Sequence, residues 1–252
     1  MIIASQISKS YGDTLVVDGV SVSIPAGGVT SIIGPNGAGK STLLSIVARL
    51  MSMDTGTVTV DGLDVTKTPS ETLAKRLSIL RQDNHISSRL TVRDLVGFGR
   101  YPYSKGRPTI EDKVHIDRAL EYLHLENLAG RFLDELSGGQ RQRAFVAMVL
   151  CQDTDYVLLD EPLNNLDMKH ASGMMKIMRR AADELKKTVV LVLHDINFAS
   201  WYSDTIIAMR EGRICHQGPA DGIISPDILE DIYDMPIRVE EIDGRRICLF
   251  YE

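Results

Sequence analysis

The sequence predicts an α/β fold with a parallel sheet at its centre, an antiparallel β layer before it and a helical region between its strands. Three observations predict this fold. A β-branched segment at residues 29–33 leads into a glycine-rich loop and then into a mostly apolar helix at 42–50. The segments 156–160 and 188–193 are almost wholly apolar and lead into ionisable side chains. Continuous apolar strands are typical of parallel sheets, whose carboxyl ends bind ligands.

The glycine-rich loop carries the most specific motif in the chain. Residues 34–41 fit G-x-x-x-x-G-K-[ST], between a strand and a helix as this motif requires. Glycines let backbone N–H groups turn toward phosphate oxygens, and the helix N-terminus adds partial positive charge. Lys40 is expected to reach the β- and γ-phosphates, and the Ser41 hydroxyl to bind Mg²⁺. A glycine-rich turn without a ligand would not need these flanks, so we expect a bound nucleoside triphosphate.

Composition limits the class of protein. The chain has 252 residues, of which 44% are hydrophobic and 25% charged, and a formal net charge of −6, as is usual for globular proteins. An acidic chain does not favour nucleic acid as a partner. We expect no signal peptide and no membrane span, because the longest apolar run covers only residues 189–193. Cys151, Cys215 and Cys248 form no metal-ligand pattern and are expected to be reduced, mostly packed thiols.

The segments on either side of the loop predict an antiparallel β layer. Residues 2–7, 15–24 and 57–60 have strand patterns and are separated by turn residues. Tyr11 is the one aromatic residue in a turn near the nucleotide segment. It is either a half-buried turn tyrosine with a solvated hydroxyl or a stacking platform for adenine.

The region after the short strand at 77–80 is predicted to be mainly helical. Thr91 can cap a helix at 92–97, and residues 111–123 are amphipathic. Between them, residues 99–108 are expected to form a basic and aromatic loop. Such a loop could suit nucleic acid, but one short patch on an acidic chain is weak support for that partner.

Residues 137–143 predict a second helix N-terminus with unusual chemistry. Ser137 and Gln140 have the spacing of a capping box, and the apolar residues 144–151 continue the helix. Gly138 and Gly139 are poor helix formers, so their presence in the first turn needs a reason. They either form a cap without a ligand or give a phosphate group access to backbone N–H groups.

Four polar side chains are expected near the carboxyl ends of strands. Asp160 is placed to hold the Mg²⁺ shell, and Glu161 to orient and deprotonate a water that attacks the γ-phosphate. His194 is either a hydrogen-bonded structural histidine or a contact to the γ-phosphate. Gln82 is either a surface amide or a contact to Mg²⁺ or to the attacking water.

The C-terminal part is predicted to hold a long helix, two hairpins and a short helix. The long helix covers residues 168–186, and its methionines at 168, 174, 175 and 178 are expected to fill the core. The hairpins join 205–209 to 213–216 and 238–242 to 246–250, and the short helix covers 227–233.

With these motifs the chain resembles the ATP-binding subunits of ABC transporters over nearly its whole length, in both motif order and spacing. The resemblance assigns the adenine-stacking aromatic to Tyr11, the Walker A loop to Gly34, Pro35, Asn36, Gly37, Ala38, Gly39, Lys40, Ser41 and Thr42, the Q-loop to Gln82, the LSGGQ signature to Leu136, Ser137, Gly138, Gly139 and Gln140, the Walker B strand to Tyr156–Asp160, the catalytic carboxylate to Glu161, the D-loop aspartate to Asp167 and the switch histidine to His194. It favours the functional alternative for Tyr11, Gln82, Ser137 and His194.

The resemblance implies a P-loop NTPase core of the RecA-like kind. The ABC ATP-binding cassette would span residues 1–252, with a helical subdomain inserted at about 84–150. Two copies would face each other head to tail, and each ATP would lie between the Walker A loop of one copy and the signature of the other. Catalysis would rest on Glu161, His194 and Gln82, and Mg²⁺ on Ser41, Gln82 and Asp160.

The resemblance also implies partners and a location. The cassette would form a homodimer, bind integral membrane permease subunits and work indirectly with a substrate-binding protein. No nucleic acid is expected. The protein would lie peripherally at the cytoplasmic face of the inner membrane.

Within the family, residues 99–102 resemble the helical-subdomain loop of importers of iron-siderophores, haem and cobalamin. Residues 161–167 are most similar to the iron-siderophore branch, of the ferric enterobactin kind. Importers of haem or cobalamin, an exporter and a soluble ABC ATPase are the alternatives. The last class commonly has two cassettes, a long coiled coil or zinc-binding cysteines, which this sequence lacks. One departure is present: residues 163–165 are Leu-Asn-Asn, where many relatives carry Thr-Ser-Ala before the Leu-Asp of the D-loop.

Overall fold

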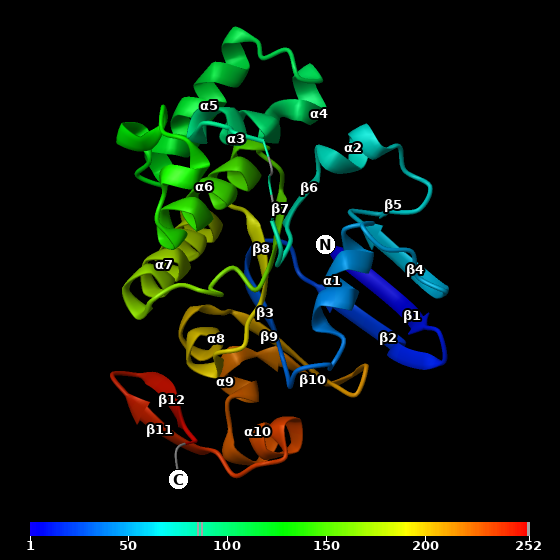
Figure 1. Ribbon diagram of the computed structural model, residues 1–252. Coiled ribbons are helices and arrows are strands. Elements are labelled where there is room, and N and C mark those ends of the chain that lie inside the picture. Colours follow the sequence, from blue (N-terminus) through cyan, green and yellow to red (C-terminus); the bar gives the residue numbers. More distant parts are fainter. Residues whose placement is uncertain (85, 87, 251–252) are drawn as a thin grey trace.

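A six-stranded sheet forms the centre of the computed structural model, which describes residues 1–84, 86 and 88–250 (Figure 1). Its strand order is β10-β9-β3-β8-β7-β6; all neighbouring pairs are parallel except β9 and β10. The strands are β3 (Gly28–Ile33), β6 (Leu77–Leu80), β7 (Tyr156–Asp160), β8 (Thr188–Val192), β9 (Thr205–Arg210) and β10 (Arg213–Pro219). Every residue of β7 and β8 is buried, which confirms the prediction drawn from their continuous apolar character.

The predicted antiparallel β layer is present as a second sheet. Its strand order is β2-β1-β4-β5, and it comprises β1 (Ile2–Tyr11), β2 (Thr14–Ile24), β4 (Thr55–Val60) and β5 (Leu63–Asp64). Helix α1 (Lys40–Val47) lies between this layer and the central sheet, where Leu43 and Leu44 are 1% exposed. One apolar cluster joins β1, β2, β4, α1 and one face of the central sheet. The phosphate loop is therefore attached to two sheets at once.

A second apolar cluster covers the opposite face of the central sheet and continues into the helical part of the molecule. Figure 1 shows α3, α4, α5 and α6 gathered at one end, and α10 with the β11–β12 hairpin at the other. The remaining elements are α2 (Ser70–Ala74), α3 (Val92–Gly97), α4 (Tyr101–Ser104), α5 (Ile110–Tyr122), α6 (Gly138–Cys151), α7 (Met168–Glu184), α8 (Ile196–Tyr202), α9 (Ala220–Ile223), α10 (Pro226–Tyr233), β11 (Arg238–Ile242), β12 (Arg245–Leu249) and 3₁₀ turns at Phe98–Arg100, Glu126–Leu128 and Leu133–Glu135. Within the described residues, no helix is long and apolar enough to span a bilayer.

The structure corrects three expectations about elements. The segment 99–108, expected as a loop, contains the end of a 3₁₀ turn and helix α4, because Pro102 is accommodated in the first turn of a helix. Helix α1 begins at Lys40 rather than at residue 42, since Gly39 adopts the left-handed conformation directly before it. Helix α8 was not predicted, because its residues include aromatic and polar types that form helices weakly on their own.

The methionine prediction was right for three residues and wrong for one. Met174, Met175 and Met178 are at most 1% exposed and pack in the core. Met168 is 88% exposed, because it is the first residue of α7 and lies before the buried face of that helix begins. The periodic pattern of α7 thus predicts burial correctly only from its second turn onward.

A buried ion pair organises the helical end of the molecule. The Arg100 guanidinium donates to Asp112 at 2.9 Å and to the carbonyl of Cys151 at 3.1 Å, and both charged side chains are at most 4% exposed. Tyr103 stacks on the guanidinium at 3.8 Å. Burial by itself raises the pKa of Asp112, but hydrogen bonds from Thr109 and Arg100 outweigh it and lower the pKa to about 2. Arg100, expected in a basic and aromatic loop, is therefore buried and has a structural role.

We predict that Asp112→Ala lowers the free energy of unfolding by about 3–5 kcal/mol, because it leaves the Arg100 charge buried without a partner. Urea unfolding monitored by circular dichroism measures this change. Asp117→Ala is the matched control: its pair with Arg93 is 2.7 Å long, but both side chains are about half exposed, so the loss should stay within about 1 kcal/mol.

The difference in free energy of unfolding between the wild-type chain and Asp112→Ala should decrease as the pH falls. A carboxyl whose pKa is depressed stabilises the folded state above its ordinary pKa of about 4, and this contribution is lost as pH falls toward 2. Equal losses for both variants, or a difference that does not narrow in acid, would contradict the role of this ion pair.

Candidate active site

The phosphate loop joins β3 to α1 and is shaped by its glycines. Gly34, Gly37 and Gly39 have φ values of 140°, 80° and 94°, which L side chains rarely adopt. A Cβ on Gly34 would lie 2.0 Å from the carbonyl oxygen of Met209, so the loop also needs close backbone contact there. No side-chain hydrogen bond caps α1 within the described residues. The first N–H groups of this helix are thus available to an anion.

Lys40 is folded back over the loop. Its ammonium group donates to the carbonyl oxygens of Gly34 at 2.8 Å and of Pro35 at 2.9 Å, and the residue is 5% exposed. Burial lowers the pKa of Lys40, and the nearby carboxylates of Glu161 and Asp160 partly oppose that shift. A buried ammonium group whose partners are neutral carbonyls can exchange them for the oxygens of a phosphate at little cost.

Ser41 and Asp160 meet between α1 and the end of β7. The Ser41 hydroxyl donates to Oδ1 of Asp160 at 2.8 Å, and Asp160 is 6% exposed. Burial raises the pKa of Asp160, while the hydrogen bond from Ser41 opposes this. A hydroxyl and a carboxylate are oxygen donors of the kind that Mg²⁺ prefers, so this pair fits such an ion.

Glu161 is the centre of a hydrogen-bond cluster at the strand ends. Its side chain is 8% exposed, and its backbone has a left-handed φ of 49°. Gln82 donates to Oε2 at 2.7 Å, and Nε2 of His194 lies 2.6 Å from Oε1. The side-chain amide of Asn164 also donates to Oε2. The structure thus brings Gln82, Glu161 and His194 together, and it places the Gln82 amide on Glu161 rather than on Ser41 or Asp160.

Asn164 is the member of this cluster that sequence reasoning missed. Its only signal was the departure of residues 163–165 from the usual family pattern. A turn after β7 brings Asn164 back to Glu161. The backbone N–H of Asn164 donates to the backbone carbonyl of Glu161 at 3.2 Å, and its side-chain amide donates to the Glu161 carboxylate. The unusual D-loop residue therefore contacts the predicted base within the same chain.

Tyr11 lies at the end of β1 rather than in a turn, and it is 49% exposed. Its hydroxyl contacts the sulfur of Met51 at 2.8 Å. An exposed ring is compatible with both sequence-based alternatives, the surface tyrosine and the stacking platform.

The predicted capping box at the start of α6 is confirmed. The Ser137 hydroxyl accepts from the backbone N–H of Gln140 at 3.3 Å, and the Gln140 side chain accepts from the N–H of Ser137 at 3.0 Å. No hydrogen bond in the described part of the chain joins residues 137–140 to the phosphate loop or to Glu161. This second helix N-terminus is separate from the first within one chain.

The two glycines of α6 have different surroundings. A Cβ on Gly139 would lie 2.8–2.9 Å from ring carbons of His170, whereas a Cβ on Gly138 would have 3.9 Å to its nearest neighbour, the carbonyl oxygen of Asn165. His170 also donates its backbone N–H to Asp167 at 2.8 Å and contacts that carboxylate with Nδ1 at 2.8 Å. These hydrogen bonds lower the pKa of Asp167. Packing against His170 is thus one reason for glycine at 139.

These features define a class of protein before any relative is considered. A glycine-rich loop at the carboxyl end of a parallel strand, a buried lysine over it, a serine–aspartate pair and an adjacent hydrogen-bonded glutamate are the parts of a nucleoside-triphosphate hydrolase of the P-loop kind. The loop follows β3, the lysine and the serine begin α1, and the aspartate and the glutamate lie at the end of β7; β3 and β7 flank β8 in the central sheet.

Known proteins specify the family. The ABC transporter family pattern matches residues 17–164. The petrobactin import ATP-binding protein YclP of Bacillus subtilis (strain 168) is 54% identical over 251 residues, 100% of both chains. FatE of Bacillus anthracis, also a petrobactin import ATP-binding protein, is 53% identical over 97% of both chains. The ferric enterobactin transport ATP-binding protein FepC of Escherichia coli (strain K12) is 40% identical over 91% of this chain and 86% of its own.

Solved structures agree with this assignment. A dimeric ATP-binding cassette in a post-hydrolysis state with ADP and Pi superposes with a TM-score of 0.78 at 28% identity, over 87% of this chain and 99% of that chain. An inward-facing putative metal-chelate type ABC transporter has a TM-score of 0.84 over 99% and 98% of the two chains, and at 22% identity it supports the fold alone. The chain belongs to the ABC transporter family. It is the ATP-binding subunit, whose hydrolysis of ATP is coupled to transport.

We predict that Gly139→Ala lowers the free energy of unfolding by about 1–3 kcal/mol, because the new methyl group overlaps the His170 ring. In a His170→Ala background most of this loss should disappear, which a double-mutant cycle of urea unfolding measures. Gly138→Ala is the control, and it should stay within about 1 kcal/mol. A Gly139→Ala effect that His170→Ala leaves unchanged would show that the clash is not its cause.

Proposed function

We propose that this chain powers the import of a ferric siderophore, of the petrobactin kind, through a membrane permease. The observation that carries the proposal is the 54% identity to a petrobactin import ATP-binding protein over 100% of both chains. The relatives described above are named for petrobactin or ferric enterobactin transport, which supports the siderophore importer that the residues favoured over an importer of haem or cobalamin. The siderophore itself would not contact this subunit.

In the proposed hydrolysis, Glu161 accepts the proton of the water that attacks the γ-phosphate of ATP. Both of its carboxylate oxygens already have partners: Nε2 of His194 lies 2.6 Å from Oε1, and Oε2 accepts hydrogen bonds from Gln82 and Asn164. These contacts orient the carboxylate, and one of them must open to admit the water. His194 and Gln82 then border the γ-phosphate and the water. Lys40 and the N–H groups of the phosphate loop hold the phosphates.

Ser41 and Asp160, with Gln82 nearby, would hold Mg²⁺. The contact of 2.8 Å between the Ser41 hydroxyl and Asp160 shows that two oxygen donors already converge beside the phosphate loop. When bound, the ion neutralises charge on the β- and γ-phosphates. Gln82 donates to Glu161 instead, so its approach to the ion would require a rotation of its side chain.

We propose a homodimer in which the signature of each copy completes the ATP site of the other. Within the described residues, no hydrogen bond joins the capped N-terminus of α6 to the chain's own phosphate loop, and helix N-termini suit phosphates. A related cassette, 28% identical, is dimeric with ADP and Pi. ATP would favour the closed dimer because it contacts both copies, and loss of the γ-phosphate would let the dimer open.

We predict that Glu161→Gln keeps ATP binding and lowers steady-state ATP hydrolysis by about 10²–10⁴-fold, the usual contribution of a general base. The amide preserves the size of the side chain and most of its contacts to Gln82 and His194. Nucleotide titration measures binding, and phosphate release measures turnover. Normal turnover in this variant would remove Glu161 from the role of base.

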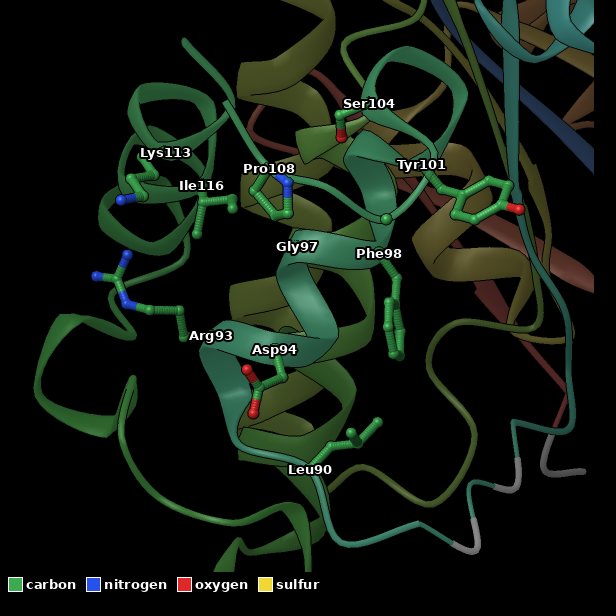
Figure 2. A pocket seen from close by; sticks show the side chains of 11 residues that line it. Leu90, Arg93, Asp94, Gly97, Phe98, Tyr101, Ser104, Pro108, Lys113 and Ile116 are labelled. Atoms are coloured by element: carbon green, nitrogen blue, oxygen red, sulfur yellow. The ribbon is translucent and has the colours of Figure 1, made fainter. Parts of the chain in front are cut away.

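A groove between α3, α4 and α5 is the proposed site of contact with the permease. It has a volume of about 610 Å³, and Figure 2 shows Phe98, Tyr101 and Leu90 along it, with Arg93 and Lys113 at one side. Phe98 and Tyr101 are 51% and 61% exposed, which is unusual for large aromatic side chains. A short amphipathic helix from a cytoplasmic loop of the permease is the occupant that fits such a groove. The protein would then lie at the cytoplasmic face of the inner membrane.

Reconstitution tests this function. We predict that the chain, combined in proteoliposomes with the permease encoded beside its gene, hydrolyses ATP faster when a binding protein loaded with ferric petrobactin is added. Binding proteins loaded with haem or cobalamin should give no such increase. Phe98→Asp should abolish recovery of this subunit with the permease, because it places a charge in the apolar groove.

Ile110→Asp is the matched control for the groove, since Ile110 is 84% exposed and lies outside the lining. It should leave recovery with the permease unchanged. If the binding protein loaded with haem or cobalamin stimulates ATP hydrolysis and the one loaded with ferric petrobactin does not, the proposed ligand is wrong but the import function stands. Recovery of ribosomes or nucleic acid, without a permease, would leave the ATPase chemistry and overturn the import function.

A further inference from the structure

Three potential metal-binding side chains gather between β10 and α10, outside the ATPase site. Cys215 and His216 are adjacent on β10, and Asp231 comes from α10. One ligand atom from each residue, a sulfur, an imidazole nitrogen and a carboxylate oxygen, lies within 4.8 Å of the other two. None of the three belongs to the motifs that bind or hydrolyse ATP.

A β-bulge explains how two adjacent strand residues can serve one site. Neighbouring residues of a regular strand point to opposite faces of the sheet. Here Ile214 pairs with Met209 of β9, but it is His216, not Cys215, that pairs with the next residue, Ala208. Cys215 is therefore an extra residue in β10, and bulges of this kind redirect side chains.

The side chains are packed loosely enough to admit an ion. Nε2 of His216 lies 2.7 Å from Oδ2 of Asp231, and the two side chains are 30% and 55% exposed. The Cys215 thiol donates to the carbonyl of Ala208 at 3.4 Å. Arg210 is the nearby opposing charge; it lies 3.6 Å from Oδ1 of Asp231 and also donates to the Asp231 carbonyl. This arrangement fixes Asp231 and leaves Oδ2 directed at His216.

We propose that Cys215, His216 and Asp231 bind one divalent transition-metal ion of the Zn²⁺ type. Zinc takes thiolate, imidazole and carboxylate ligands together, and bond lengths of about 2.0–2.3 Å place tetrahedral ligand atoms ~3.3–3.8 Å apart. Small side-chain rotations separate His216 from Asp231 and bring the thiol closer. Water completes the fourth position. Mg²⁺ and Ca²⁺ do not suit this set, because they prefer oxygen ligands alone.

A bound ion would cross-link α10 to β10, the edge strand of the central sheet. The ion would replace the present direct contact between His216 and Asp231 with metal–ligand bonds to all three side chains, and it would bind the folded chain in preference to the unfolded one. Metal in large excess over its dissociation constant should therefore raise the melting temperature by several degrees.

Cobalt titration tests the site, because Co²⁺ replaces Zn²⁺ and reports thiolate ligation by a charge-transfer band in the near ultraviolet. The full chain, reduced, without an affinity tag, nucleotide or Mg²⁺, should bind one Co²⁺ per chain and release it to Zn²⁺. Cys215→Ser should abolish the band. His216→Ala and Asp231→Asn should weaken Co²⁺ binding at least tenfold.

Cys248→Ala is the matched control, since Cys248 is 1% exposed and lies apart from the cluster, so the band should persist. Circular dichroism checks that each variant folds; if Cys215→Ser does not, the other two variants decide. No band in the wild-type chain, a band that survives Cys215→Ser, or unchanged affinity after His216→Ala and Asp231→Asn would overturn the proposal. None of these outcomes bears on ATP hydrolysis or on import.

Discussion

The register of three parallel strands is the constraint on which the ATPase site depends. Ile32 of β3 pairs with Val192 of β8, and Val192 pairs with Asp160 of β7. The three strands therefore end at one level. The backbone continues from β3 into the phosphate loop, from β8 to His194 and from β7 to Glu161. A shift of one residue in either pair would also turn the buried side chains of that strand to the wrong face. Core packing and catalytic geometry are thus specified by the same pairing.

Around this register the molecule uses two kinds of polar group. Asp160 and the Glu161 carboxylate are buried, Ser41 is partly buried and Gln82 is exposed. Hydrogen bonds join Ser41 to Asp160 and Gln82 to Glu161, so these side chains are oriented before any nucleotide arrives. The pair of Arg100 and Asp112 is equally buried but lies in the helical end, where it packs α4 against α5 and α6. The first group lies at the strand ends that form the candidate active site, and the second joins elements of the helical end.

Much of the fold and most of the candidate site could be predicted from the sequence. Continuous apolar runs located β7 and β8, and glycine spacing located the phosphate loop, because strand burial and backbone conformation leave direct marks in residue type. Capping boxes located the start of α6 in the same way. Helix α2 has no side-chain cap, and α8 has the Asp195 cap as a local mark but no longer pattern, so neither was predicted. Their residues form helices weakly alone and are held by packing against the sheets.

Only the tertiary structure decided which side chains meet when their segments are far apart in the sequence or are joined by a turn. The side chain of Asn164 donates to Glu161, and His170 packs on Gly139. Arg100 forms a buried ion pair with Asp112. A bulge places Cys215 beside His216 and Asp231. The sequence by itself determined the strands, the phosphate loop and the chemistry at the strand ends, since these follow from local patterns. It could not determine these contacts, because side-chain neighbours depend on how separate elements pack.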